Sequence, residues 1–112
     1  MASPDELWLV DFGDPYPGEP ASYRPALVVG PSRLFPDTLP FVIVVPLTTT
    51  RRGLLLHVEV EPSAANGLDE TSYVQCEWVR SINRRRLVSQ LGRADSGVTY
   101  EVSRILRTLL NF

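Results

Sequence analysis

Arg24 is the residue whose setting in the sequence best suits the binding of an anion. It precedes Pro25, where the loop 13–23, rich in proline and glycine, runs into an apolar strand. Proline disfavours helical backbone at the residue before it and lacks an amide donor, so Arg24 starts from an extended, fixed point at the mouth of the loop. A planar guanidinium held in this way can grip a phosphate or a carboxylate. It could equally form an ordinary surface ion pair, which this stretch alone favours.

Thr48 is a second candidate, because it ends an apolar strand just after Pro46. Its hydroxyl is expected to emerge at a strand terminus, although threonines there usually satisfy backbone groups. Arg80 and the arginines at 84–86 follow a later strand. A run of charge is by default a solvated face.

His57 and Cys76 are the only residues of their kinds, and both have simpler explanations than catalysis. His57 lies beside Glu59 on the polar side of an alternating strand, so we expect a solvated side chain. Cys76 shares the apolar side of its strand with Trp78, so we expect an inert core thiol. Nucleophile–histidine chemistry is therefore poorly supported, and one histidine with one cysteine cannot supply a structural zinc site.

The length and composition predict a single soluble globular domain, 1–112. The longest apolar run, 41–47, is interrupted by proline and is too short to span a bilayer. The N-terminal stretch lacks a basic start and an apolar signal core, and a lone cysteine suits a reducing compartment. We therefore expect a cytoplasmic protein that needs neither a membrane, a metal nor another cofactor.

The charge pattern leaves nucleic-acid binding open. The net charge is −2, which argues weakly against general nucleic-acid binding. Every basic residue is an arginine, however, and arginines cluster at 51–52 and 84–86. A mildly acidic protein with such patches can still hold a short single strand through stacking and a few phosphate contacts.

The elements that must position these residues are short strands followed by one helix. Apolar runs and period-2 alternation predict strands at 7–12, 26–30, 41–45, 54–61, 71–79 and 87–92. One helical turn is expected at 62–67, closed by Gly67, and a turn or short helical link at 83–86. From about Gly97 the apolar spacing changes to three and four, which predicts an amphipathic helix capped by Ser96 or Asp95. This order predicts a mainly β, small-barrel fold.

Three stretches resemble, in order, the signature blocks of the MazF/PemK-type toxins. They are WLVDFGDPYPGEPASYRPALVV (8–29), VIVVPLT (42–48) and GLDETSYVQCEWVRSINRRRL (67–87). The resemblance covers nearly the whole chain, and the first block is the most specific of the three. It implies an SH3-like β-barrel with a C-terminal α-helix, usually in a symmetric homodimer. It also implies a sequence-selective endoribonuclease of a type II toxin–antitoxin pair, which cuts single-stranded RNA without a metal and is inhibited by a cognate antitoxin.

The resemblance also assigns site residues. In such toxins the arginine of R-P and the threonine of P-L-T form the catalytic pair, and here they match Arg24 and Thr48. Some relatives use an acid at the position of Glu77, and a loop acid matching Glu19 is tied to substrate binding. Thr49 stands where the family often has serine and keeps a hydroxyl. Two departures put the cleavage specificity in doubt, namely asparagine in place of aspartate at 83 and the lack of asparagine in 31–35.

The implied reaction fits a chain without a credible nucleophile. The 2′-hydroxyl attacks the adjacent phosphorus and expels the 5′-oxygen, which leaves a cyclic phosphate. Arg24 suits charge stabilisation on the phosphoryl oxygens, with Thr48 positioning the phosphate. Thr48 could also relay a proton and Glu77 could be the general base, and the sequence does not decide between them.

Substrate binding is expected along the 13–23 loop and near Arg51 and Arg80, with Tyr16 and Tyr23 as possible stacking faces. Such a surface also suits an acidic antitoxin segment. Two rival functions remain: a toxin of the same fold that inhibits a protein such as DNA gyrase, and a non-catalytic SH3-like binding module. Relatives of the gyrase-directed kind lack the R-P and P-L-T pair, which argues against the first.

Overall fold

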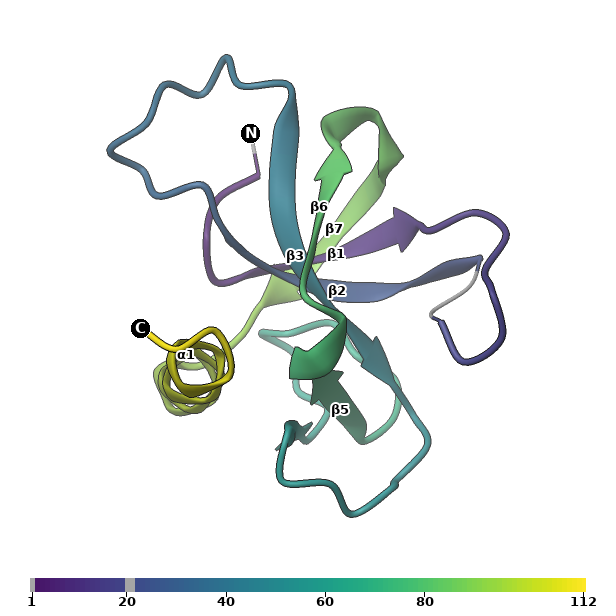
Figure 1. Cartoon of the computed structure of the whole chain (residues 1–112). Helices are drawn as coiled ribbons and strands as arrows, with labels where there is room; N and C mark the ends of the chain where they lie inside the picture. The colour runs from purple at the N-terminus through teal and green to yellow at the C-terminus, as the bar shows by residue number, and fades with distance from the viewer. Residues whose placement is uncertain (1, 20–21) are drawn as a thin grey trace.

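The computed structural model describes residues 2–19 and 22–112 and confirms a mainly β chain with one C-terminal helix (Figure 1). The strands are β1 Glu6–Asp11, β2 Tyr23–Gly30, β3 Phe41–Thr48, β4 His57–Val60, β5 Ser72–Gln75, β6 Arg80–Asn83 and β7 Leu87–Arg93. Two short 3-10 turns, η1 Cys76–Trp78 and η2 Arg84–Arg86, flank β6, and the helix α1 spans Ser96–Leu109. Within the described residues, no helix is long and apolar enough to cross a membrane.

The strands form one antiparallel sheet that bends into a small barrel-like fold. The hydrogen-bonded order is β4-β5-β3-β2-β1-β7, and β6 also pairs with β3. In the part of the chain that the structure describes, β4 and β7 stay the two ends of this order, so the barrel is not closed by a ladder. The central strand β3 pairs with β2, β5 and β6, so one strand connects most of the sheet.

Alternation along β2 separates two hydrophobic cores. Leu27 packs in the larger core beneath α1, together with Val102 and Ile105 of the helix. Ala26 and Val28 face the other way, into a smaller core formed with residues of β1, β3 and β6. Successive side chains of a strand point to opposite faces, so β2 has a helix-covered face and a second face.

The structure changes the bounds of three predicted strands: one ends early, one begins late and one is longer than predicted. The strand predicted at 71–79 ends at Gln75, where η1 turns the chain, and resumes as β6. The strand predicted at 54–61 begins only at His57, because the preceding residues form a turn closed by the His57 amide donating to the carbonyl of Leu54 at 3.1 Å. β3 runs on through the buried Pro46 to Thr48. Apolar alternation marks these segments but does not reveal where a turn interrupts pairing.

The turn at 62–67 is confirmed, and Gly67 closes it. The Gly67 amide donates to the Ser63 carbonyl at 3.1 Å, and the backbone of Gly67 has φ +70°. A Cβ placed at Gly67 would lie 2.1 Å from the carbonyl oxygen of Leu91. Both the backbone conformation and the contact with β7 therefore require glycine here.

Two glycine variants should separate these requirements. Gly53 has a similar φ of +66° but open space around the site of a Cβ. Gly53→Ala should therefore lower the free energy of unfolding by about 1 kcal/mol through backbone strain alone. Gly67→Ala should cost at least about 2 kcal/mol more, because β7 must also move. Urea denaturation of both variants measures the difference, and equal losses would show that the contact with Leu91 is unimportant.

The N-cap of α1 is Asp95 rather than Ser96. The Oδ1 atom of Asp95 accepts a hydrogen bond from the amide of Val98 at 3.0 Å, and Asp95 has extended backbone. Ser96 is instead the first helical residue. The helix packs two buried side chains, Val102 and Ile105, against the larger core, so its first turn supports that packing.

Removing the cap should destabilise the protein measurably. Asp95→Ala should lower the free energy of unfolding by about 1 kcal/mol, because the Val98 amide loses its acceptor. Ser96→Ala is the matched control one residue along and should change it by less than about 0.5 kcal/mol. Thermal and urea melts of the two variants test this order. A larger loss in Ser96→Ala would reassign the cap.

Candidate active site

The β2–β3 register brings the two predicted catalytic residues together. Ala26 pairs with Pro46 and Leu27 with Val45 in this antiparallel ladder. Arg24 and Thr48 each lie two residues beyond the Ala26–Pro46 pair, at neighbouring strand ends, and alternation puts both side chains on the face of that pair. Both side chains are half-buried. The site therefore lies where β2 begins and β3 ends, beside the loop between β1 and β2, which Figure 1 draws on the side away from α1.

Arg24 and Arg80 both belong to the second face of the sheet. The side chain of Arg24 points to the face of β2 opposite to that of Leu27, because the two residues are an odd number of positions apart. Arg24 also pairs with Val10 of β1, a residue of the smaller core. Arg80 pairs with Val44 of the same core, and its guanidinium lies 5.6 Å from the centre of the Phe12 ring. This cation–π contact holds an exposed arginine over the face.

Arg24 also lies near a second arginine that sequence reasoning did not single out. Burial, followed by the charge of Arg52, lowers the pKa of the Arg24 guanidinium below its usual range. A dominant carboxylate partner would raise that pKa. The lowered pKa therefore means that the burial of Arg24 and its repulsion by Arg52 outweigh the attraction of Arg24 to any acid. A bound anion would relieve both effects, which makes the neighbourhood suitable for a phosphate. The only sequence signal for Arg52 was its place in the Arg51-Arg52 pair.

Thr48 and Thr49 are positioned differently. The Oγ1 atom of Thr48 accepts a hydrogen bond from the amide of Thr50 at 3.2 Å, which fixes the side chain at the strand end. A hydroxyl that accepts in this way keeps its own hydrogen to donate, for example to a phosphate oxygen. Thr49 is exposed beyond the end of β3.

Glu19 shapes the loop between β1 and β2. Its Oε1 atom accepts from the amide of Tyr16 at 2.8 Å, and its own amide donates to the Tyr16 carbonyl at 3.0 Å. These bonds hold a turn at which Tyr16 is 81% exposed, and Tyr23 at the start of β2 is 64% exposed. Two tyrosine rings are thus offered to solvent beside the Arg24 end of the sheet, as stacking on bases requires.

His57 is not a solvated residue, which corrects the prediction from strand alternation. Its side chain is only 3% exposed, and its Nε2 atom lies 2.8 Å from Oε2 of Glu77. The side chain does point away from the larger core, as the alternation predicts. The turn before β4 and the η1 turn after β5 enclose it, because the amide of Cys76 donates to the carbonyl of Leu56. Period-2 reasoning gives the face of a strand but not what folds over it.

Cys76 is a core residue, as predicted. It is fully buried in the larger core at the start of η1. Burial, together with the charge of Glu77, raises the pKa of the Cys76 thiol to about 12. A thiol that stays neutral and enclosed is a poor nucleophile.

Among the residues that the structure describes, no group of three or more histidine, cysteine, aspartate and glutamate side chains could hold a metal ion. Arg24, Arg80 and the Thr48 hydroxyl lie on the second face of the sheet. These groups can bind a phosphodiester, stabilise added negative charge and exchange hydrogen bonds with it.

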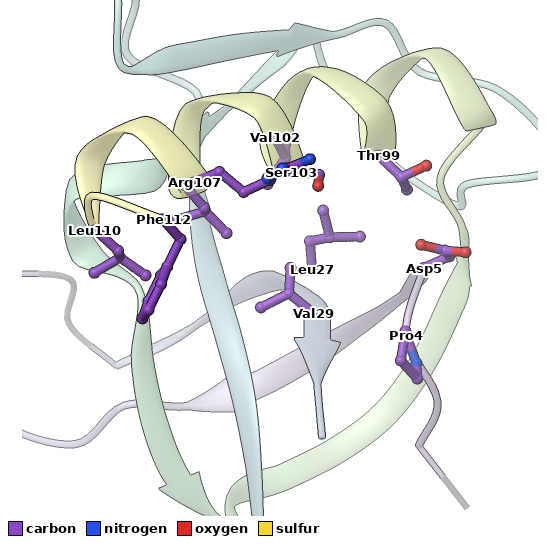
Figure 2. A pocket seen from close by; sticks show the side chains of 11 residues that line it. Pro4, Asp5, Leu27, Val29, Thr99, Val102, Ser103, Arg107, Leu110 and Phe112 are labelled. Atoms are coloured by element: carbon purple, nitrogen blue, oxygen red, sulfur yellow. The ribbon is translucent and has the colours of Figure 1, made fainter. Parts of the chain in front are cut away.

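A separate groove lies on the helix-covered face of β2. Figure 2 shows Leu27 and Val29 of the strand beneath Val102 and Ser103 of α1. The groove between them has a volume of about 330 Å³. Because Leu27 and Val29 alternate with Ala26 along β2, this groove opens on the face opposite to Arg24. It therefore does not belong to the Arg24 site.

A family model describes the sequence. The model for the PemK-like, MazF-like toxin of the type II toxin–antitoxin system matches residues 4–110. The chain is also 34% identical to a probable endoribonuclease MazF of Mycolicibacterium smegmatis over 79 residues, which are 70% of this chain and 68% of that protein.

Solved structures agree with the sequence comparison. The crystal structure of MazF from Deinococcus radiodurans superposes with a TM-score of 0.82 at 26% identity, over 99% of this chain and 97% of that one. An endoribonuclease from a mycobacterial species, solved with its cognate antitoxin, has the same fold with a TM-score of 0.80 at 22% identity, over 100% and 97% of the two chains. The chain belongs to the PemK-like, MazF-like toxins of type II toxin–antitoxin systems.

Proposed function

We propose that this chain is the endoribonuclease toxin of a type II toxin–antitoxin pair and that it cleaves single-stranded RNA at Arg24 and Thr48. The observation that supports these residues is the β2–β3 register, by which both lie just beyond the Ala26–Pro46 pair on the face that also holds Arg80. The relatives named endoribonuclease favour RNA over a protein target such as DNA gyrase. A non-catalytic SH3-like module would leave this pairing without a purpose.

The reaction we propose needs no protein nucleophile. The 2′-oxygen forms a bond to phosphorus while the bond between phosphorus and the 5′-oxygen breaks, and a 2′,3′-cyclic phosphate is left. One proton leaves the 2′-hydroxyl and one reaches the 5′-oxygen. Arg24 stabilises the charge that builds on the phosphoryl oxygens, and Thr48 donates to one of them.

Substrate binding follows from the charges around this pair. Arg52 and Arg80 supply further positive charge for the neighbouring phosphates, and Tyr16 and Tyr23 supply stacking faces for unpaired bases. The loop 13–23 would then determine which RNA sequences can bend to fit the site and be cleaved. Glu19 contributes indirectly, because it holds the turn that presents Tyr16.

Three further features complete the proposal. The whole chain, 1–112, forms one toxin domain that acts in the cytoplasm, where single-stranded RNA is available. A cognate antitoxin inhibits it by laying an acidic segment over the arginines. The mycobacterial endoribonuclease that shares the fold was solved in complex with its cognate antitoxin. The toxin acts as a homodimer, in line with the exposed apolar side chains of Leu34, Phe35 and Phe112.

Loss of Arg24 should abolish most of the activity. Arg24→Ala should slow cleavage of single-stranded RNA in EDTA by about a hundredfold to a thousandfold, since one preorganised donor to the transition state is lost. Thr48→Ala should also slow it, and Thr48→Ser should recover much of the rate because the hydroxyl returns. The assay follows cyclic-phosphate ends by gel electrophoresis.

Arg107→Ala is the control for loss of charge alone, because Arg107 is an exposed arginine late in α1. This variant should cleave RNA at the wild-type rate. Cleavage by Arg24→Ala at the wild-type rate would overturn the proposed site. Failure of the wild-type protein to cut any RNA in EDTA would overturn the proposed function itself.

Cys76 should be dispensable for cleavage. Because the pKa of its thiol is about 12, the native protein at pH 8 should resist alkylation by iodoacetamide, and unfolding in urea should expose the thiol to it. Cys76→Ala should keep the cleavage rate within about twofold and lose only stability. Rapid alkylation of the folded protein, detected by mass spectrometry together with loss of activity, would contradict this.

A further inference from the structure

A small hollow lies beside the Thr48 end of β3. Its walls include Arg51, His57, Glu59 and Tyr73, and its volume is about 160 Å³. Pockets that hold drug-sized ligands run from about 300 to 1,000 Å³, so this hollow has room for a single ring system. The cleavage reaction itself does not use the hollow, because that reaction involves only the phosphate and the two sugar oxygens beside it.

Strand pairing places the hollow next to Thr48. Tyr73 of β5 is the Cα partner of Thr48 on one side and of Glu59 on the other. Directly opposite residues of an antiparallel pair point to the same face, with Cβ atoms about 4.5–5.5 Å apart. Leu47 and Val74, one position along, pack in the larger core. Thr48, Tyr73 and Glu59 therefore form a row across three strands, on the face away from that core.

The loop after β3 connects the hollow with the proposed cleavage site. The amide of Thr50 donates to Oγ1 of Thr48 at 3.2 Å, and Arg51, the next residue, lines the hollow. Burial and then the charge of Arg52 lower the pKa of Arg24, so Arg52 acts on the cleavage site. Two successive arginines thus act on two adjoining places. A phosphate bound at Thr48 would have the hollow beside it, at the distance of the next cross-strand neighbour.

His57 gives the hollow a fixed wall. Its side chain is 3% exposed, and its Nε2 atom lies 2.8 Å from Oε2 of Glu77. Its Nδ1 atom is enclosed and has no hydrogen-bond partner among the described residues. The pairing at one ring nitrogen and the enclosure of the other hold the ring in place. The hollow is therefore formed before a ligand arrives, and little ordering is lost on binding.

The groups on the walls match the edges of guanine. Glu59 is exposed, and a carboxylate only accepts hydrogen bonds. Guanine is the one common RNA base with two adjacent donors, N1–H and the N2 amino group, on its Watson–Crick edge. The guanidinium of Arg51 is a donor fork of the kind that binds O6 and N7 of guanine. Tyr73 supplies an aromatic ring on which an unpaired base can stack.

The other bases match these groups less well. Adenine and cytosine present one amino group to a carboxylate, and uracil presents one ring N–H. An acid beside a phosphate-binding site also repels the RNA backbone, so Glu59 opposes binding unless donors of a base pair with it. The presence of Glu59 in the row that begins at Thr48 therefore favours a base with two donors.

We propose that this hollow binds the guanine of a nucleotide next to the scissile phosphate. Glu59 accepts from N1–H and the N2 amino group, Arg51 donates to O6 and N7, and Tyr73 stacks on the ring. Glu59 is thus a specificity-determining residue. The inference rests on the proposed ribonuclease function and names the base that the RNA must carry.

The first experiment measures the base preference. The wild type, Glu59→Ala and Glu61→Ala cut single-stranded RNA of random sequence in EDTA, and both new ends are sequenced. The wild type should favour guanosine about tenfold over the other bases at one of the two positions that flank the cut, as a bidentate contact to a base does. Glu59→Ala should lose this preference. Glu61→Ala is the matched control and should keep it, because the Glu61 carboxylate accepts from Oγ1 of Thr71 at 3.2 Å and lies outside the hollow.

The second experiment removes a donor from the base instead of the acceptor from the protein. Inosine is guanosine without the N2 amino group, so inosine at the preferred position loses one hydrogen bond to Glu59. The wild type should cut the guanosine oligonucleotide with a kcat/KM about tenfold higher than the inosine one. Glu59→Ala should cut the two within about twofold of each other. A residue that only supports the fold would lower both rates and leave their ratio unchanged.

Equal rates of the wild type on the guanosine and inosine oligonucleotides would overturn the proposal, and this comparison needs no variant. A preference for another base at both flanking positions, or a guanosine preference that survives in Glu59→Ala, would also overturn it. In each of these cases the wild type has cut RNA, so the ribonuclease function stands. A wild type that cuts no RNA would overturn the function, and this inference with it.

Discussion

The pairing register of β2 with β3 is the constraint on which the site depends. Ala26 opposite Pro46 fixes it, and both residues are fully buried. Side chains alternate along a strand, so a slip by one residue would move Arg24 to the helix-covered face and Leu27 to the other. The register is therefore held by burial on both faces of β2. The packing of the two cores thus also fixes the position of Arg24 relative to β3.

The two prolines at this point have opposite roles. Pro25 pairs with Leu9 and restricts the backbone of Arg24, so the start of β2 is extended before it meets β3. Pro46 lies within β3, where a missing amide removes a possible ladder bond.

Sequence reasoning found the parts of the site that depend on local pattern. Arg24 stands in R-P and Thr48 ends an apolar strand, and both signals lie within a few residues of the side chain they concern. The inward thiol of Cys76 followed from the same kind of pattern. The small barrel followed from strand spacing, since short strands without long connections leave few other architectures.

What the sequence could not predict involves contacts between distant segments. The enclosure of His57 requires η1 to fold back over β4. Glu77 lies 20 positions after His57, and alternation does not reveal the η1 turn that brings it back. The proximity of Arg52 to Arg24 likewise depends on the loop after β3. Such contacts are set by tertiary packing, and single-sequence periodicity carries little information about them.

The division of the sheet into two faces explains how a small chain can tolerate a costly site. The larger core and α1 lie on one face, and Val102 and Ile105 of the helix pack into it. The second face holds a smaller core, half-buried Arg24 and the enclosed acceptors around His57. Apolar burial on the first face offsets the repulsion and desolvation on the second. Arginines can therefore stay close together on this face, as a phosphate-binding site requires.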